Sequence, residues 1–131
     1  MTLTRIPAPE GVAPATRYTH VVSGTGRFVA IAGQVALDEK GELVGEGDPV
    51  AQVRQAFVNL RRCLAAAGAT FADVIKVTYY FTAPEVLQAV RDVRDELDDW
   101  PEPPASTAVQ IAALFDPRFV IEIEAFAVVP E

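Results

Sequence analysis

The most regular alternation of apolar and polar residues lies near the end of the chain, at residues 119–129. Alternation predicts a strand with Ile121, Ile123, Ala125 and Ala127 on one face and Val120, Glu122, Glu124, Phe126 and Val128 on the other. A second strand is expected at 106–112, with a turn at Asp116-Pro117. Because a solvated face seldom carries so many apolar side chains, we expect helices to cover one face and another subunit the other. Glu122 and Glu124 would then line or border a cleft.

Two stretches have the three- and four-residue spacing of amphipathic helices. The first is expected to begin after Asp48, an N-cap followed by Pro49, and to end near Ala67, before Gly68. The second follows residues 82–85, which have the spacing of a capping box, and ends near Leu97. The expected apolar stripes are Val50, Val53, Phe57, Leu60, Leu64 and Ala67 in the first helix, and Val86, Val90, Val93 and Leu97 in the second.

Further strands are expected at 16–23, 27–37 and 73–81, with a short one at 42–44. Residues 23–26 predict a hairpin turn between the first two, after an irregular leader at 1–15. The order β-β-α-β-α-β-β predicts a single α+β domain over residues 1–131. Its two layers are a mixed, partly parallel sheet and two helices packed on one face. The open face, expected to hold Lys76, Thr78 and Tyr80 beside Val74, needs a partner.

Composition narrows the classes of partner. The net charge of −7 and the isoelectric point of about 4.6 argue against nucleic acids and anionic membranes. No apolar run approaches the roughly 18–20 residues of a membrane span, and the N-terminus lacks the apolar segment of a signal peptide. A single cysteine, Cys63, excludes an intrachain disulfide and indicates a cytoplasmic protein. With one histidine as well, a structural zinc site within one chain is not expected.

Residues 103–109, Pro-Pro-Ala-Ser-Thr-Ala-Val, and the later Glu-Ile-Glu at 122–124 resemble the C-terminal signature of the RidA/YjgF family. The resemblance also covers the tyrosine segment near residue 18, Gly33-Gln34 and the block at 66–81. It implies a RidA-like, chorismate-mutase-like fold, a homotrimer and small-molecule clefts between subunits. No organic cofactor and no metal is implied, since protonated imines are already electrophilic.

The resemblance implies a role for several residues. Glu122 matches the residue that the family places beside a catalytic water, and Tyr18 matches its active-site tyrosine. Ser106 stands where the deaminases of the family carry an arginine, which binds a carboxylate in a bidentate manner. Substrate contacts are also implied for Ala32, Gly33 and Thr107; Ala32 replaces a common serine, and Ala108 an expected cysteine.

Each candidate also has a structural interpretation. Glu122 can serve an ion pair across the interface, Tyr18 can be an aromatic core residue, and Glu124 is read as structural. Arg91, on the second helix, is a candidate to replace the missing arginine, against an ordinary pair with Asp95 four residues on. His20, Cys63 and Trp100 are read as structural, and Gly33 as a bulge or a close backbone approach.

The predicted function is therefore imine or enamine hydrolysis on a small reactive metabolite at a subunit-interface cleft. Because Ser106 replaces the arginine, the substrate is expected to differ from the usual 2-aminoacrylate. The alternative is a trimer that binds a small metabolite without turnover. A ribonuclease function, suggested by old family labels, is disfavoured by the acidic chain.

Overall fold

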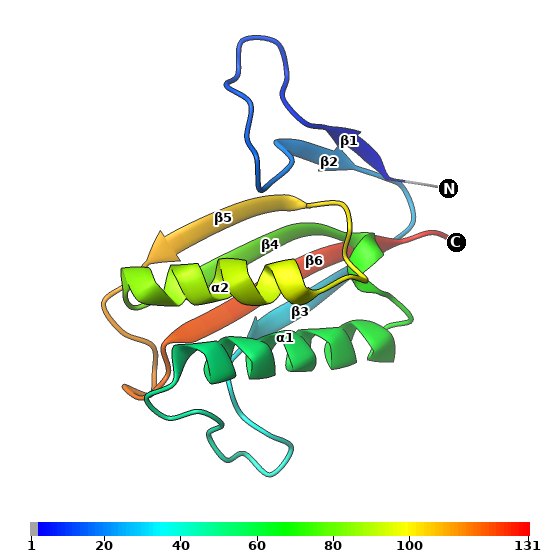
Figure 1. Ribbon diagram of the computed structural model, residues 1–131. Helices are drawn as coiled ribbons and strands as arrows, with labels where there is room; N and C mark the ends of the chain where they lie inside the picture. Colours follow the sequence, from blue (N-terminus) through cyan, green and yellow to red (C-terminus); the bar gives the residue numbers. More distant parts are fainter. Residues whose placement is uncertain (1–2) are drawn as a thin grey trace.

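The computed structural model describes residues 3–131 and contains two α-helices, one 3₁₀ helix and six strands. The strands are β1 (Thr4–Ile6), β2 (Val21–Ser23), β3 (Arg27–Gln34), β4 (Val74–Phe81), β5 (Ala105–Gln110) and β6 (Ile121–Val129). The helices are α1 (Pro49–Ala66), the 3₁₀ helix η1 (Phe71–Asp73) and α2 (Pro84–Glu96). A four-stranded sheet has the order β3-β6-β4-β5, and β1 and β2 form a separate small sheet (Figure 1).

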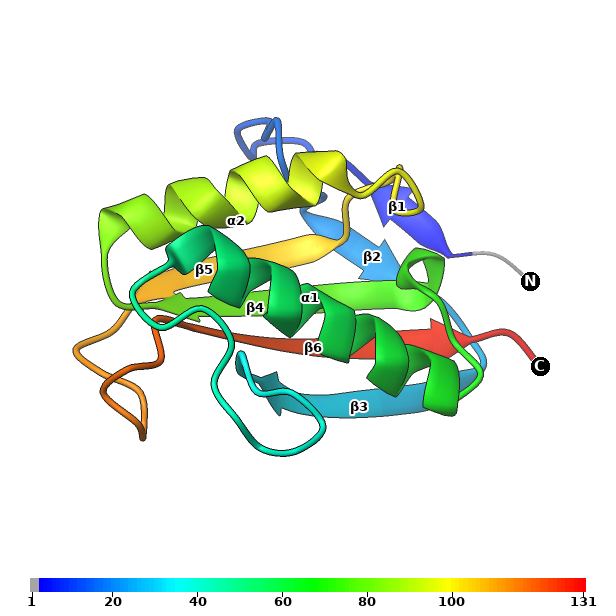
Figure 2. The ribbon, with the colours of Figure 1, turned by 60° about the horizontal axis from the view of Figure 1, so that its bottom comes forward.

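The main sheet is mixed, because β4 and β5 are parallel whereas β6 runs antiparallel to both β3 and β4. Both helices lie on the same side of it, as the turned view makes plain (Figure 2). The buried residues between the layers come from the expected stripes, among them Val53, Phe57, Leu60, Val86 and Val93. The predicted two-layer α+β architecture is therefore confirmed.

Helix α1 begins and ends where its flanking residues predict. The carboxylate of Asp48 accepts a hydrogen bond from the backbone N–H of Ala51 at 3.1 Å, and Pro49 opens the helix. Gly68 follows the C-cap with φ of +73°, a conformation that favours glycine. The expected capping box before α2 is wrong: Ala83 is the N-cap, and no side chain caps that end.

The alternation predicted for β6 is confirmed, since Ile121, Ile123, Ala125 and Ala127 are all buried under the helices. The observed strand begins at Ile121 rather than 119, and β5 covers 105–110 rather than 106–112. Val74 was expected on the open face and is instead fully buried in the core. The reason is a register irregularity between Val74 and Lys76. Because of it, Val74 faces the helices whereas Lys76, two positions on, faces the open side.

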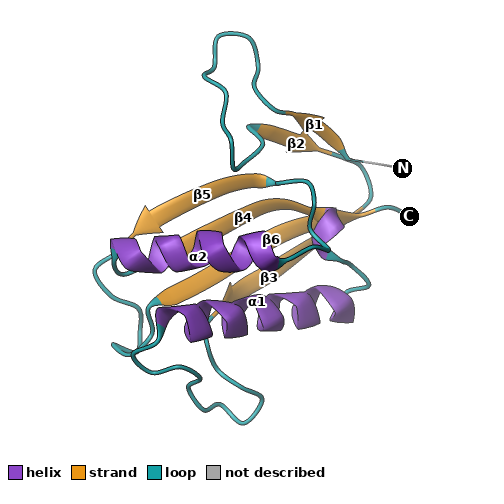
Figure 3. Ribbon diagram, in the orientation of Figure 1, coloured by secondary structure: helices purple, strands orange, loops and turns teal. Residues whose placement is uncertain are grey.

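The N-terminal region differs most from expectation. Residues 4–6 of the expected irregular leader form β1, which pairs antiparallel with β2. The predicted hairpin between residues 16–23 and 27–37 is therefore wrong, because β2 is short and pairs with β1 instead of β3. The expected strand at 42–44 is reduced to an isolated bridge between Leu37 and Leu43. Between β1 and β2 a long loop leaves the main body and returns to the start of β5 (Figure 3).

None of the helices formed by residues 3–131 combines the length and the apolar character needed to cross a membrane.

Candidate functional site

The sheet sorts the candidate residues onto its two faces. On β5, Ser106 pairs in register with Val77 and Ala108 with Tyr79, so these residues share the helix-covered side. Thr107, one position along, faces the open side, where Thr78 and Tyr80 also point. Glu122 pairs with Tyr80 and therefore lies on the open side as well. Within one chain, Ser106 and Glu122 cannot meet in a single site.

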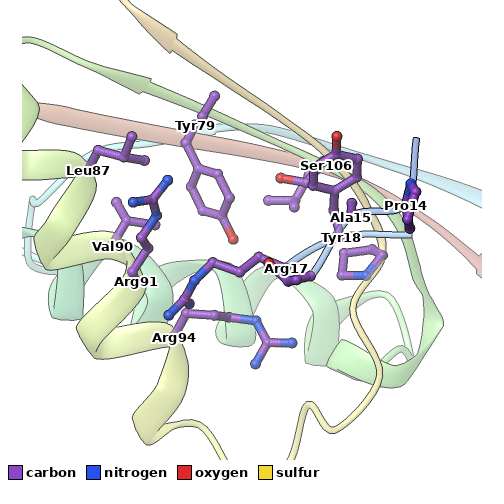
Figure 4. A pocket seen from close by; sticks show the side chains of 14 residues that line it. Pro14, Ala15, Arg17, Tyr18, Tyr79, Leu87, Val90, Arg91, Arg94 and Ser106 are labelled. Atoms are coloured by element: carbon purple, nitrogen blue, oxygen red, sulfur yellow. The ribbon is translucent and has the colours of Figure 1, made fainter. Parts of the chain in front are cut away.

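A cavity of about 410 Å³ lies on the helix-covered side, at the edge of the sheet between α2, β5 and the loop that precedes β2 (Figure 4). Its size falls in the range of small-molecule sites. Three of the sequence candidates line it: Tyr18, Arg91 and Ser106. The remaining lining residues are Pro14, Ala15, Thr16, Arg17, Val77, Tyr79, Leu87, Val90, Arg94, Pro104 and Ala108.

Thr19 holds the loop that carries Tyr18. Its backbone N–H donates to the carbonyl of Pro104 at 3.1 Å, and its hydroxyl donates to the carbonyl of Pro103 at 2.6 Å. The ring of Tyr18 meets His20 edge-on, with centroids 5.1 Å apart, and His20 Nε2 lies 2.8 Å from the carbonyl oxygen of Ala13. His20 therefore braces the loop, and Tyr18 is an exposed lining residue rather than a core aromatic.

The cavity is positively charged although the chain is acidic. Arg17, Arg91 and Arg94 line it, and its lining contains no carboxylate among the residues that the structure describes. Arg17 is partly neutralised, because it makes two hydrogen bonds of 3.2 and 3.3 Å to the carboxylate of Asp95. A cavity with this lining favours a ligand that carries negative charge.

Arg91, in contrast to Arg17, has no hydrogen-bond or ion-pair partner in the described part of the chain. The alternative pairing of Arg91 with Asp95 does not occur, since Asp95 is taken by Arg17. An arginine at a cavity mouth with all its donors available is suited to binding a carboxylate.

Tyr79 and Arg94 were not singled out from the sequence. Arg94 lies over the Trp100 ring at 4.1 Å and donates to the carbonyl of Trp100 at 2.7 Å, so its guanidinium is fixed in place. Burial lowers the pKa of Arg94, with nearby Tyr79 and Asp95 opposing that shift. The sequence did contain one signal for Arg94: it follows Arg91 by three residues, a spacing that places both side chains on one side of a helix.

On the open face, the side chain of Glu122 occupies the space above Gly33. A β-carbon at Gly33 would collide with the Glu122 carboxylate, and the β3–β6 register is irregular between Ile31 and Gln34. Gly33 therefore lies in the irregular part of the β3–β6 pairing, as predicted, and the close approach there is made by the Glu122 side chain instead of by backbone. Within residues 3–131, Glu122 has no hydrogen-bond or ion-pair partner. Ala32 is exposed on the same strand and lies outside the cavity.

The polar residues near Glu122 on the open face make hydrogen bonds to other residues of the same chain. Glu124 accepts a hydrogen bond of 2.7 Å from the hydroxyl of Tyr80, and this bond is the main cause that raises the pKa of Tyr80. Lys76 donates to the hydroxyl of Thr107 at 3.0 Å. Glu124 and Thr107 thus have structural partners, whereas the Glu122 carboxylate remains available.

No group of three or more His, Cys, Asp or Glu side chains in the described residues is placed to hold a metal ion.

Comparison with known proteins gives one consistent result. The chain matches the family described as Endoribonuclease L-PSP over residues 9–129. It is 39% identical to the RutC family protein YjgH of Escherichia coli, over 88% of this chain and 85% of that one. It is 34% identical to the 2-iminobutanoate/2-iminopropanoate deaminase of Mus musculus, over 92% and 85% of the two chains.

Comparison with solved structures leads to the same family. The Rid family protein YyfB of Yersinia pestis superposes with a TM-score of 0.84 at 38% identity, covering 98% of this chain and 100% of that one. RidA from an Antarctic Psychrobacter gives a TM-score of 0.71 at 32% identity, covering 98% and 99%. The chain belongs to the RidA/YjgF family, whose members include proteins named as imine deaminases and others named as putative endoribonucleases.

Proposed function

We propose that the protein hydrolyses imines or enamines of small carboxylic acids, in a site assembled from two copies of the chain. One observation carries the proposal: the cationic cavity and the free carboxylate of Glu122 lie on opposite faces of the same sheet. A second copy that packs its open face beside the cavity would bring the two together. The proposal therefore includes a homo-oligomer, with a trimer as the expected form.

The chemistry follows from the groups available. The guanidinium of Arg91 binds the substrate carboxylate, and the hydroxyls of Tyr18 and Ser106 orient the imine. Glu122 of the neighbouring copy accepts a proton from water as the water oxygen attacks the iminium carbon. The resulting carbinolamine loses its nitrogen as ammonia, with the proton returned by Glu122, and a 2-oxo acid leaves. No electrons are transferred.

Binding without turnover is the second candidate, and one observation favours it. The cavity of a single chain contains no carboxylate among the described residues and so holds no group that activates water by itself. If copies associate by another surface, the cavity remains an anion-binding site alone.

The test is hydrolysis of imines generated in situ by an amino-acid oxidase from several amino acids. The protein is compared with Glu122→Gln and with the matched control Glu124→Gln. The Glu124 carboxylate already accepts a hydrogen bond from the Tyr80 hydroxyl. We expect acceleration that Glu122→Gln abolishes and Glu124→Gln retains. No acceleration by the wild-type protein from any amino acid favours binding without turnover.

A Ser106→Arg variant adds a further arm to this assay. It places a guanidinium on the cavity side of β5, opposite Val77 in the β4–β5 register. Activity that appears only in this variant would mean that Glu122 is competent, while the natural ligand is not a 2-imino acid of the usual kind.

A further inference from the structure

The phenol of Tyr79 is a buried polar group without a partner. Its residue is only 7% exposed, and its hydroxyl has no hydrogen-bond partner in residues 3–131. Among these residues, Arg5 Nε is the one side-chain nitrogen or oxygen that is both inaccessible to solvent and without a hydrogen bond. The unbonded Tyr79 hydroxyl is therefore accessible, and it is accessible from the cavity that Tyr79 lines. Figure 4 shows it pointing into that space. Buried tyrosines usually find a partner, so this hydroxyl is available to a ligand.

The charged residues of the cavity indicate what kind of ligand atom fits. Arg94 lines the same cavity as Tyr79, and its guanidinium is held by Trp100. Guanidinium is a donor only, and a neutral phenol has its own O–H to donate. A cavity lined by such donors and by no carboxylate among the described residues matches a ligand oxygen acceptor, most strongly a carboxylate.

Depth separates this acceptor position from the anchor at the mouth. Val77 and Tyr79 are buried and form the floor, whereas Arg91 and Tyr18 are exposed at the rim. Apolar side chains of Leu87 and Val90 line the cavity as well. A ligand held by Arg91 therefore meets both an apolar wall and the Tyr79 hydroxyl in the same cavity.

The cavity is also large for the smallest imino acids. A water molecule takes roughly 30 Å³ of liquid volume, so about 410 Å³ has room for on the order of a dozen water-sized groups. The small residues at 106 and 108 leave this space open on the β5 side. An imino acid of three or four carbons would therefore leave much of the cavity unfilled.

We propose that the cavity selects a carboxylic acid with a second oxygen acceptor at its far end, and that the Tyr79 hydroxyl is the specificity-determining donor for it. The inference rests on the proposed function, since it concerns the ligand of the same cavity. It names the substrate class as imines of dicarboxylic or similarly substituted acids.

Binding of two non-hydrolysable 2-oxo acids tests this inference by calorimetry. The probes are 2-oxoglutarate, which has the second carboxylate, and 2-oxobutanoate, which lacks it. We expect the wild-type protein to prefer 2-oxoglutarate about tenfold, and Tyr79→Phe to remove that preference while 2-oxobutanoate binding changes less than about twofold. Tyr80→Phe is the matched control, because its hydroxyl lies on the other face and bonds Glu124.

Three outcomes would overturn the inference: equal wild-type affinity for the two probes, a Tyr79→Phe variant that keeps the preference, or one that weakens both probes alike. The first needs no variant and stands even if Tyr79→Phe fails to fold. These binding outcomes are separate from the imine assay. Loss of selectivity with intact hydrolysis overturns only this inference, and selective binding without hydrolysis overturns only the proposed reaction.

Discussion

The side chain of Glu122 lies where a side chain at position 33 would be, and only glycine at that position leaves room for its carboxylate. The two residues come from neighbouring strands, β6 and β3, on the open face of the sheet. Gly33 is therefore required by a contact rather than by an unusual backbone angle, since its φ is not in the positive range. The pair positions the one free carboxylate of the proposed reaction.

Gly33→Ala should displace Glu122 at little cost to the fold. The colliding atoms belong to a flexible side chain, so we expect a loss of about 1 kcal/mol in the free energy of unfolding as Glu122 leaves its rotamer. Imine hydrolysis should fall toward the level of Glu122→Gln. Urea denaturation and the oxidase-coupled assay measure the two effects.

A double-mutant cycle provides the control for this prediction. In a Glu122→Ala background the collision is gone, so Gly33→Ala should become neutral or slightly stabilising. A cost that persists in that background would show that the backbone, and not Glu122, requires glycine.

Arg91 should be the main anchor for the ligand carboxylate. We expect Arg91→Ala to weaken 2-oxobutanoate binding by about tenfold to a hundredfold, because a hydrogen bond to a charged group contributes roughly 1.5–3 kcal/mol. Calorimetry measures the change. Arg62→Ala is the matched control, since Arg62 is exposed on α1 and does not line the cavity. Equal affinities in the two variants would exclude Arg91 as the anchor.

The buried phenol of Tyr79 predicts a dependence of stability on alkaline pH. Burial raises its pKa above the ordinary value of 10.0, with the positive charge of Arg94 opposing in part. The native state thus keeps a proton that the unfolded chain loses, so this contribution is complete below pH 10 and declines as pH rises above it. Tyr79→Phe should lose less stability than the wild-type protein between pH 9 and about pH 11.5 in urea denaturation. An equal loss in both proteins would contradict the account.

Local signals in the sequence were sufficient for much of the architecture. Asp48, Pro49 and Gly68 define α1 because capping depends on neighbouring residues only. The alternation in β6 separates the buried face from the one with Glu122 for the same reason. The misplaced elements depend on distant partners: β2 pairs with β1 instead of β3, and the irregularity after Val74 is a property of two paired strands.

The candidate site was harder to predict, because it depends on which face each side chain takes. Tyr18, Arg91 and Ser106 do meet in one cavity, far apart as they are in the sequence. Tyr79 lies on the buried face of β4 and its sequence position predicts a core aromatic, so its free hydroxyl is recognised only once the cavity is placed. Thr107 points away from Ser106 by simple strand alternation.

The central claim, that one copy supplies the cavity and another supplies Glu122, is tested most directly by subunit complementation. Each variant alone is expected to lose most of its activity, Arg91→Ala through weaker substrate binding and Glu122→Gln through loss of the base. Differently tagged chains of the two variants are co-expressed, and mixed oligomers are isolated through both tags. We predict that imine hydrolysis returns in the mixed oligomers, because some sites then combine an intact cavity with an intact Glu122. Mixed oligomers no more active than a blend of the separately purified variants would contradict the shared site.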